Sequence, residues 1–321
     1  MNHFCIRDSI IAMDKNKDYF VRAYTGNGEV RAFAINSKHL VEEARKIHNT
    51  SPIATAALGR TMSAALMLAE TLKDKETLTL LFKGDGPLKE VVAISDANAC
   101  VKGYVQGKGV VMMPNASGHL NVGGALGKGT LTVIRDMHLK EPYISTIPLH
   151  SGEIADDLTY YFATSEQTPT SIALGVLMNK DATVREAGGF FVQLLPSATE
   201  KTISILESNI SKIHAVTDLL KEGKTPEEIL DVVLTGLEPI LITEEKEVHY
   251  RCSCNRERFE KVLIALGRKE LRDMILEGKP IETECDFCGK KYMFSISELQ
   301  ELYDSLMQQK TNQTNEKRSG K

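Results

Sequence analysis

Four of the chain's six cysteines fall within a 37-residue window, as C-S-C at 252–254 and C-D-F-C at 285–288. In a reducing compartment, closely spaced cysteine pairs indicate metal or redox chemistry rather than structural disulfides. Zinc is soft enough for sulfur, has no redox chemistry of its own and prefers four ligands in tetrahedral geometry. We therefore predict one zinc ion bound by Cys252, Cys254, Cys285 and Cys288.

The spacing of the cysteines leaves the role of this site open. A closed structural site is favoured, a redox role comes next, and a catalytic zinc would need an open position that four cysteines do not leave. The C-x-C pair also permits a strained disulfide between near neighbours. His249 lies close by and could replace a ligand, although a lone solvated histidine is the preferred interpretation.

The segment between the two pairs reads as a helix over Arg256–Leu276, with Val262, Leu263, Leu266 and Ile275 as its apolar positions. The cysteine region is therefore a small domain of ~50 residues, whose apolar core is too small to fold alone. Metal binding can supply the missing stability, on the order of 10 kcal/mol.

The first ~180 residues predict one mixed α+β domain. We expect a hairpin around Gly26-Asn27-Gly28, a helix after Ser37 and a largely buried helix from Ser51 to about Leu72. Another helix is expected in Ser151–Tyr161. The predicted strands are Thr77–Phe82, Leu88–Ser95, Val101–Gln106, Thr130–Arg135, Tyr143–Pro148 and Gly188–Leu195.

From about Thr199 the pattern becomes helical, with one helix running to Gly223 and a second starting at the capping box of Thr225. The first helix carries a narrow apolar stripe, so it needs a surface to lie on. That stripe is either packed against the core or a surface for clients or partners. It consists of Ile203, Leu206, Ile210, Ile213, Val216 and Leu220.

Charge and composition exclude several classes of protein. The net charge is −4, and residues 249–299 hold ten Lys plus Arg against nine Asp plus Glu, so neither gives the basic field that nucleic acid or an anionic membrane attracts. The longest stretch without Asp, Glu, Lys or Arg, Gly109–Gly127, contains Pro114 and many polar residues and is no membrane span. The first residues lack the apolar core of a secretion signal, and the chain is expected in the cytoplasm.

Other candidate sites give weaker signals. Gly123–Thr130 resembles a phosphate-binding loop but fails on spacing, and a strand rather than a helix follows it. No set of nucleophile and base stands out, so we predict no enzymatic activity. Cys5 and Cys100 are isolated and are expected to be small packing residues. The polar end, Gln308–Lys321, is expected to be a disordered tail.

The pattern C-x-C, thirty residues, C-x-x-C resembles the redox-regulated heat-shock holdase family, the 33 kDa chaperonins. Three segments of the first domain are similar to that family as well, and the resemblance covers roughly residues 1–305. They are G-D-G-P-L at 84–88, S-G-E-I-A-D-D-L-T-Y-Y-F at 151–162 and A-G-G-F at 187–190.

The resemblance implies a switch. Reduced, zinc-bound members are folded and inactive; oxidants release the zinc, and disulfides form between motif neighbours, here Cys252–Cys254 and Cys285–Cys288. The zinc domain and the helical linker then unfold and expose an apolar surface that holds unfolding clients without ATP. Activated members are homodimers.

We therefore predict four parts: an α+β core domain (1–180), a strand end plus helical redox-sensitive linker (181–245), a zinc-binding redox-switch domain (246–305) and a disordered polar tail (306–321). The predicted function is that of a redox-regulated molecular chaperone with no catalytic turnover. The alternatives are a zinc-ribbon module that binds nucleic acid or ribosomes, and a nucleotide-dependent enzyme at the Gly-rich turns. The chaperone and the zinc-ribbon module would be separated by one observation, whether oxidation changes function while nucleic acid does not bind.

Overall fold

The computed structural model describes residues 17–73 and 75–306. Cys5, the N-terminal residues judged for a secretion signal and nearly all of the predicted tail lie outside this range. Contacts divide the chain into two compact units, Met1–Arg251 (unit 1) and Cys252–Lys321 (unit 2). This division does not test whether the four predicted parts fold separately, and their boundaries stay predictions.

Unit 1 contains an antiparallel five-stranded sheet. Its strand order is β10 (Ile240–Glu247), β1 (Tyr19–Thr25), β2 (Val30–Asn36), β9 (Val184–Leu194) and β8 (Thr170–Met178). The predicted hairpin is confirmed: β1 and β2 pair around a tight turn in which Gly28 has φ +69°, a conformation that favours glycine. β8 and β10 have no counterpart among the predicted strands.

The second sheet of unit 1 has six strands and is antiparallel except at one edge. Its order is β11 (His249–Tyr250), β5 (Cys100–Val105), β4 (Glu90–Asp96), β3 (Thr77–Gly84), β6 (Gly129–Asp136) and β7 (Tyr143–Pro148). The short β11 pairs in parallel with β5 and directly follows β10 along the chain. Residues 240–250 therefore join the edges of both sheets.

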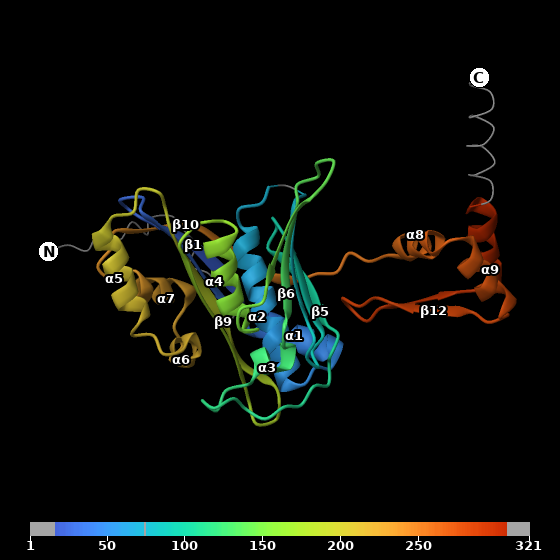
Figure 1. Ribbon diagram of the computed structural model, residues 1–321, viewed down its shortest axis with the longest axis horizontal. Helices are drawn as coiled ribbons and strands as arrows, with labels where there is room; N and C mark the ends of the chain where they lie inside the picture. The colour runs from blue at the N-terminus through green and yellow to red at the C-terminus, as the bar shows by residue number, and fades with distance from the viewer. Residues whose placement is uncertain (1–16, 74, 307–321) are drawn as a thin grey trace, which may run out of the picture. The chain divides into compact units, whose positions relative to one another are not determined.

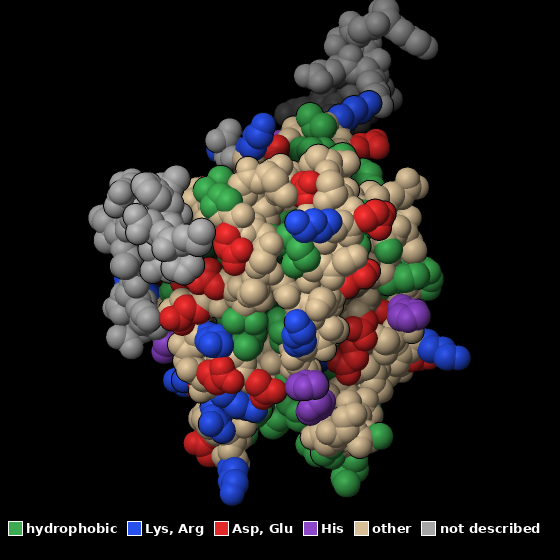
Figure 2. Space-filling model, turned by 90° about the vertical axis from the view of Figure 1, so that its left-hand side faces the viewer, with side chains coloured by type: hydrophobic (Ala, Val, Ile, Leu, Met, Phe, Trp, Pro, Cys, Tyr) green, Lys and Arg blue, Asp and Glu red, His purple; other side chains and the backbone are tan. Residues whose placement is uncertain are grey.

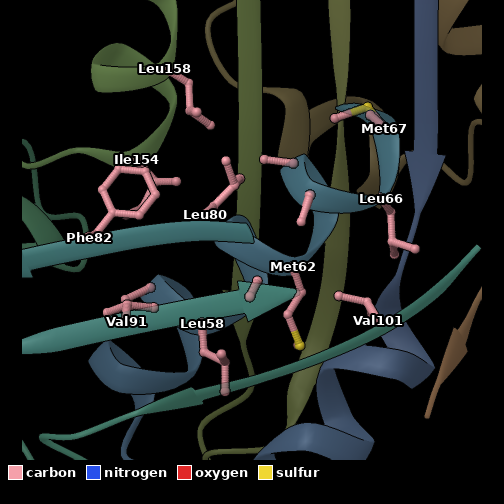
Figure 3. Close-up of a cluster of buried hydrophobic side chains, with 14 of the residues drawn as sticks. Leu58, Met62, Leu66, Met67, Leu80, Phe82, Val91, Val101, Ile154 and Leu158 are labelled. Atoms are coloured by element: carbon pink, nitrogen blue, oxygen red, sulfur yellow. The ribbon is translucent and has the colours of Figure 1, made fainter. Parts of the chain in front are cut away.

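The helix α2 (Pro52–Ala69) lies between the two sheets, with α1 (Lys38–His48) and α4 (Ile154–Thr164) beside it (Figure 1). It starts where the sequence predicts, with the Ser51 hydroxyl accepting a hydrogen bond from the amide of Ala54. In Figure 3, α2 side chains such as Met62 and Leu66 meet side chains from the six-stranded sheet and from α4. Within the described residues, α2 alone has the length and hydropathy to cross a membrane, and 83% of that window is buried inside the protein.

Three helices cover the other face of the five-stranded sheet: α5 (Glu200–Ile210), α6 (Val216–Lys221) and α7 (Pro226–Val233). The prediction of one helix from Thr199 to Gly223 is wrong, because the chain leaves the helix between α5 and α6. The apolar spacing continues across this break since both helices face the same sheet. Figure 2 shows the side of the molecule that carries them, with acidic and basic side chains interspersed.

Side-chain hydrogen bonds cap α7 and join it to α5. The predicted capping box at Thr225 is present, with the Glu228 carboxylate accepting from the Thr225 amide at 2.8 Å. The Asn209 side chain, at the end of α5, donates to the carbonyls of Val233 and Thr235 at the end of α7. Together with α6, which packs on β8 and β9, they form one layer on the five-stranded sheet.

The Gly-rich segment Gly123–Thr130 forms the end of a short helix, α3 (Val122–Leu126), and the start of β6. The strand expected after it is confirmed, and the short helix replaces the expected turn. Gly127 has φ +75°, and its position leaves no room for a side chain, because an added Cβ would lie 2.3 Å from the Asp85 carboxylate. These glycines serve close backbone packing between the turn at Asp85–Gly86 and α3.

Replacing Glu42 with glutamine is expected to reduce the stability of unit 1 by about 2 kcal/mol at pH 7. The Arg45 guanidinium binds both Glu42 oxygens, at 2.8 and 2.7 Å, and with the Val184 amide lowers the pKa of Glu42 to about 2. A carboxylate with a lowered folded-state pKa stabilises above its unfolded pKa of about 4.3 and loses that contribution as pH falls toward 2.

Urea unfolding at pH 7 and pH 3 checks this expectation. The difference in the free energy of unfolding between wild type and Glu42→Gln should be less than half as large at pH 3 as at pH 7. Glu43→Gln is the control, because Glu43 is the exposed neighbour on the same helix and should change stability by less than about 0.5 kcal/mol. A difference that is the same at both pH values would contradict the role given to the Glu42 charge.

Candidate metal centre

The described part of unit 2 contains a hairpin, two short helices before it and a further helical segment after it. The helices are α8 (Arg256–Leu266) and α9 (Arg268–Leu276), and the strands are β12 (Ile281–Glu284) and β13 (Lys291–Phe294). The prediction of a single helix over 256–276 is wrong, because Gly267 takes φ +92° and ends α8. Residues 296–306 are helical as well.

The apolar core of unit 2 is small. Within the described residues, its cluster has five buried members, Leu263, Leu271, Tyr292, Phe294 and Leu299. The predicted apolar positions Val262 and Leu266 are 52% and 48% exposed instead. A core of this size cannot offset the conformational entropy of ordering about 50 residues, so unit 2 needs a further source of stability.

The second cysteine pair lies in the turn between β12 and β13. The Cys285 amide donates to the Lys290 carbonyl, while the amides of Cys288 and Gly289 both donate to the Cys285 carbonyl. Gly289 has φ +67°, which lets the turn close. The loop therefore holds both thiols of this pair on one side of the hairpin end.

The four predicted sulfur atoms come together from the start of unit 2 and from its hairpin turn. All four lie within 4.8 Å of one another, with 3.7 Å between the Sγ atoms of Cys252 and Cys285 and 3.4 Å between those of Cys254 and Cys288. A tetrahedral zinc site with Zn–S bonds of about 2.3 Å separates its sulfurs by about 3.8 Å. The four thiols therefore fit a tetrahedral metal ion, and none is in a disulfide.

The electrostatics of the cluster also fit a cation. Burial raises the pKa of Cys288 to about 12 and also raises that of Cys285. Burial raises the pKa of Cys254 too, but hydrogen bonds from Tyr292 and the other thiols outweigh it and lower the value to about 7. Four thiolates at this separation repel one another, so all four can ionise together only around a positive ion.

Tyr292 is a site residue that the sequence reasoning missed. Its hydroxyl lies 3.3 Å from Cys254 Sγ, and its ring packs against Phe259 with centroids 4.8 Å apart. The cross-strand pairing of Thr283 with Tyr292 places it beside the cluster. Tyr292 therefore belongs both to the surroundings of the four thiols and to the apolar core of unit 2.

The other predicted residues lie elsewhere. Cys100 is a buried packing residue, as predicted. His249 belongs to β11 of unit 1 and is exposed, and within the described residues the one group suited to a metal is the four cysteines. In the apolar stripe, Leu206, Val216 and Leu220 are buried against the five-stranded sheet, while Ile203, Ile210 and Ile213 are partly exposed.

Charged side chains of unit 2 lie in pairs of opposite sign. Arg256 contacts Glu298 and Glu260, and Lys291 contacts Glu282. Arg256 also lies over the ring of Phe294, with 4.3 Å from the guanidinium carbon to the ring centroid. This pattern gives no continuous basic surface among those residues, and the absence of nucleic-acid binding stays a prediction.

Comparison with known proteins gives a consistent result. A family model described as "Hsp33 protein" matches residues 18–295. A 33 kDa chaperonin of Clostridioides difficile is 49% identical over 288 residues, which cover 89% of this chain and 98% of that protein. One from Lachnoclostridium phytofermentans is 49% identical over 286 residues, with the same coverage.

A solved structure agrees with the fold. The crystal structure of a 33 kDa chaperonin, an Hsp33 homologue from Thermotoga maritima, aligns with a TM-score of 0.84 and 37% sequence identity. The alignment covers 91% of this chain and 99% of that one.

Proposed function

Since the chain belongs to the Hsp33 family of chaperones, we propose that it is a redox-regulated, ATP-independent holdase that binds unfolding or oxidatively damaged proteins after its own oxidation. The observation that carries this proposal is the convergence of four free thiols in a unit with a five-residue buried core. A unit built in this way loses its fold when the thiols are consumed.

Zinc is the proposed metal, and when bound it would supply the positive charge that keeps four thiolates together and closes unit 2. Cys252, Cys254, Cys285 and Cys288 would hold it. Tyr292 would hydrogen-bond the Cys254 sulfur, and the backbone of the β12–β13 turn would fix the second pair.

Oxidation consumes the ligands in pairs. In each pair, two thiolates would lose two electrons as one S–S bond forms, and one hydrogen peroxide would take those electrons and two protons from water and become two waters as its O–O bond breaks. From the family resemblance we propose the pairs Cys252–Cys254 and Cys285–Cys288. Two peroxide molecules therefore suffice for the whole switch.

The loss of unit 2 is proposed to reach unit 1 through the chain that precedes it. The helices α5, α6 and α7 are short, and they owe their order to packing on the five-stranded sheet. Their release would expose the buried side of the apolar stripe and the sheet beneath it. We propose these surfaces for client binding, the homodimer as the activated form, and the cytoplasm as the location.

Treatment of the reduced, metal-loaded protein with peroxide at mildly elevated temperature is expected to release one metal ion per chain and to remove four free thiols. Light scattering of a heat-denatured client protein should fall in parallel, because apolar surface becomes available to hold it. Metal is measured with a chromophoric chelator and thiols by a colorimetric reagent.

Removal of the metal by a chelator under reducing conditions is the control that separates metal loss from disulfide formation. A thiol reductant should restore four thiols to the oxidised protein and lower its holding activity. If peroxide releases the metal and client aggregation is unchanged, the protein has a structural metal site and the redox switch is excluded.

A further inference from the structure

The outer strand of the five-stranded sheet, β10, is the least buried strand of that sheet. None of its eight residues is buried, whereas β1, beside it, has five buried residues among seven. The opposite edge strand, β8, has three buried residues. β10 is therefore held mainly by its backbone pairing with β1, from Tyr19 opposite Glu247 to Thr25 opposite Ile240.

Charged contacts also attach the side chains of β10 to its surroundings. Lys246 reaches the Glu70 carboxylate at 3.3 Å, and Glu244 contacts Arg22 at 3.3 Å. The Glu70 side chain is only 4% exposed, and its two cationic partners are Arg22 on β1 and Lys246 on β10. The loss of β10 would leave this buried carboxylate with one of them.

The position of β10 in the chain makes it the strand most exposed to a change in unit 2. Only Val248, the two residues of β11 and Arg251 separate it from the first cysteine of the metal cluster. The helix layer α5–α7 precedes it. β10 thus connects the two segments that the proposed oxidation releases, and our inference rests on that proposed function.

Departure of β10 would uncover the edge of β1, which is a row of backbone N–H and C=O groups ready to pair with another strand. On the face of the sheet that the helices cover, the space now filled by Ile240 and Ile242 would become vacant beside Ala23 and Thr25. On the other side, Glu70 would be left in need of a cation. The vacated site therefore suits an extended peptide with aliphatic side chains on one face and a lysine or arginine on the other.

We propose that the edge of β1, covered by β10 in the reduced protein, is a binding site at which an extended aliphatic and basic segment of an unfolded client pairs as an added strand. The backbone of the segment supplies the affinity, and Glu70 selects for the basic residue. This binding mode accepts clients of many sequences, because strand pairing uses groups that every chain carries.

Hydrogen exchange of the full chain tests the proposal, with the octapeptide of β10, I-L-I-T-E-E-K-E, as the probe. Oxidation should speed exchange at residues 19–25 by about tenfold or more, and both the octapeptide and a heat-denatured client should slow it again. A matched octapeptide with glutamate in place of the lysine should bind about tenfold more weakly. Client holding without protection of residues 19–25 would overturn the proposal.

A variant makes this test independent of oxidation. Lys246→Glu places a second carboxylate beside Glu70 and should open the β1 edge in the reduced protein, with exchange at 19–25 about tenfold faster and binding of the original octapeptide. Lys17→Glu is the matched control, since Lys17 contacts β10 through an exposed pair with Glu247 and should leave exchange unchanged.

The two approaches keep the two proposals apart. If peroxide gives neither metal release nor holding, the redox function fails, and the reduced Lys246→Glu protein still decides whether the edge accepts a strand. If that variant exchanges rapidly at 19–25 and does not bind the octapeptide, the edge is not a peptide site. If holding appears on oxidation while β10 stays paired, the holdase stands and the added-strand site is excluded.

Discussion

Replacing Cys285 with serine is expected to abolish tight metal binding and to unfold unit 2 while unit 1 stays folded. Cys285 is the most buried of the four thiols, at 6% exposure, and its backbone carbonyl organises the turn that holds Cys288. A serine oxygen is a poor substitute for a thiolate, and metal binding contributes on the order of 10 kcal/mol to domains of this kind. Bound metal per chain and hydrogen exchange of residues 252–306 measure the effect.

The matched control is Cys100→Ala, which removes a buried thiol from β5 that has no part in the cluster. It should retain one metal per chain and a protected unit 2. Under the proposed function, Cys285→Ser should also hold clients better than the wild type without any oxidant. A variant that keeps stoichiometric metal and a protected unit 2 would show that three thiols suffice.

Replacing Val233 with alanine is expected to loosen the helix layer α5–α7 from the five-stranded sheet. Val233 is fully buried on the sheet side of α7, and the deletion of its methyl groups should cost about 2 kcal/mol. If the open state of this layer is the client-binding state, its population in the reduced protein should rise about thirtyfold. Hydrogen exchange of residues 200–233 and client holding in the absence of oxidant are the measurements.

Val232→Ala provides a closely matched comparison. Val232 is the preceding residue on the same helix, has the same side chain and is only partly buried. Its replacement should cost about 0.5 kcal/mol and leave holding in the reduced protein unchanged. If the two variants show equal hydrogen exchange and equal client holding, the helix layer does not control client binding.

The sequence allowed the local elements of unit 1 to be predicted well where one short segment contains its own signals. Ser51-Pro52 marks the start of α2, the hairpin turn follows Thr25, and Thr225 caps α7. Apolar spacing was less reliable about continuity. The spacing indicates which side chains are buried. Because α5 and α6 pack on the same sheet, the apolar spacing continues through the break between them.

The elements that were missed depend on partners far away in the chain. β10 is a short apolar run, I-L-I, that follows Pro239 and leads into the charged T-E-E-K-E, and it becomes a strand because β1 offers an edge. The cluster of four cysteines could be predicted because cysteine spacing is a local signal. Tyr292 could not, since it reaches Cys254 through the register of the β12–β13 hairpin and the folding of α8 between the two pairs.

The arrangement of sulfurs has a topological consequence for the energy of the proposed switch. A metal held by Cys252 and Cys285 closes a loop of 33 residues, so it restricts the unfolded chain of unit 2 as a long crosslink does. The proposed disulfides between motif neighbours would close loops of only a few residues, and this exchange of a long loop for short ones would give up about 2 kcal/mol of loop-closure entropy. Oxidation would add two covalent bonds and still increase the number of conformations open to the unfolded chain of unit 2. Under the proposed pairing, the two disulfides would therefore restrict the unfolded chain of unit 2 less than the metal does.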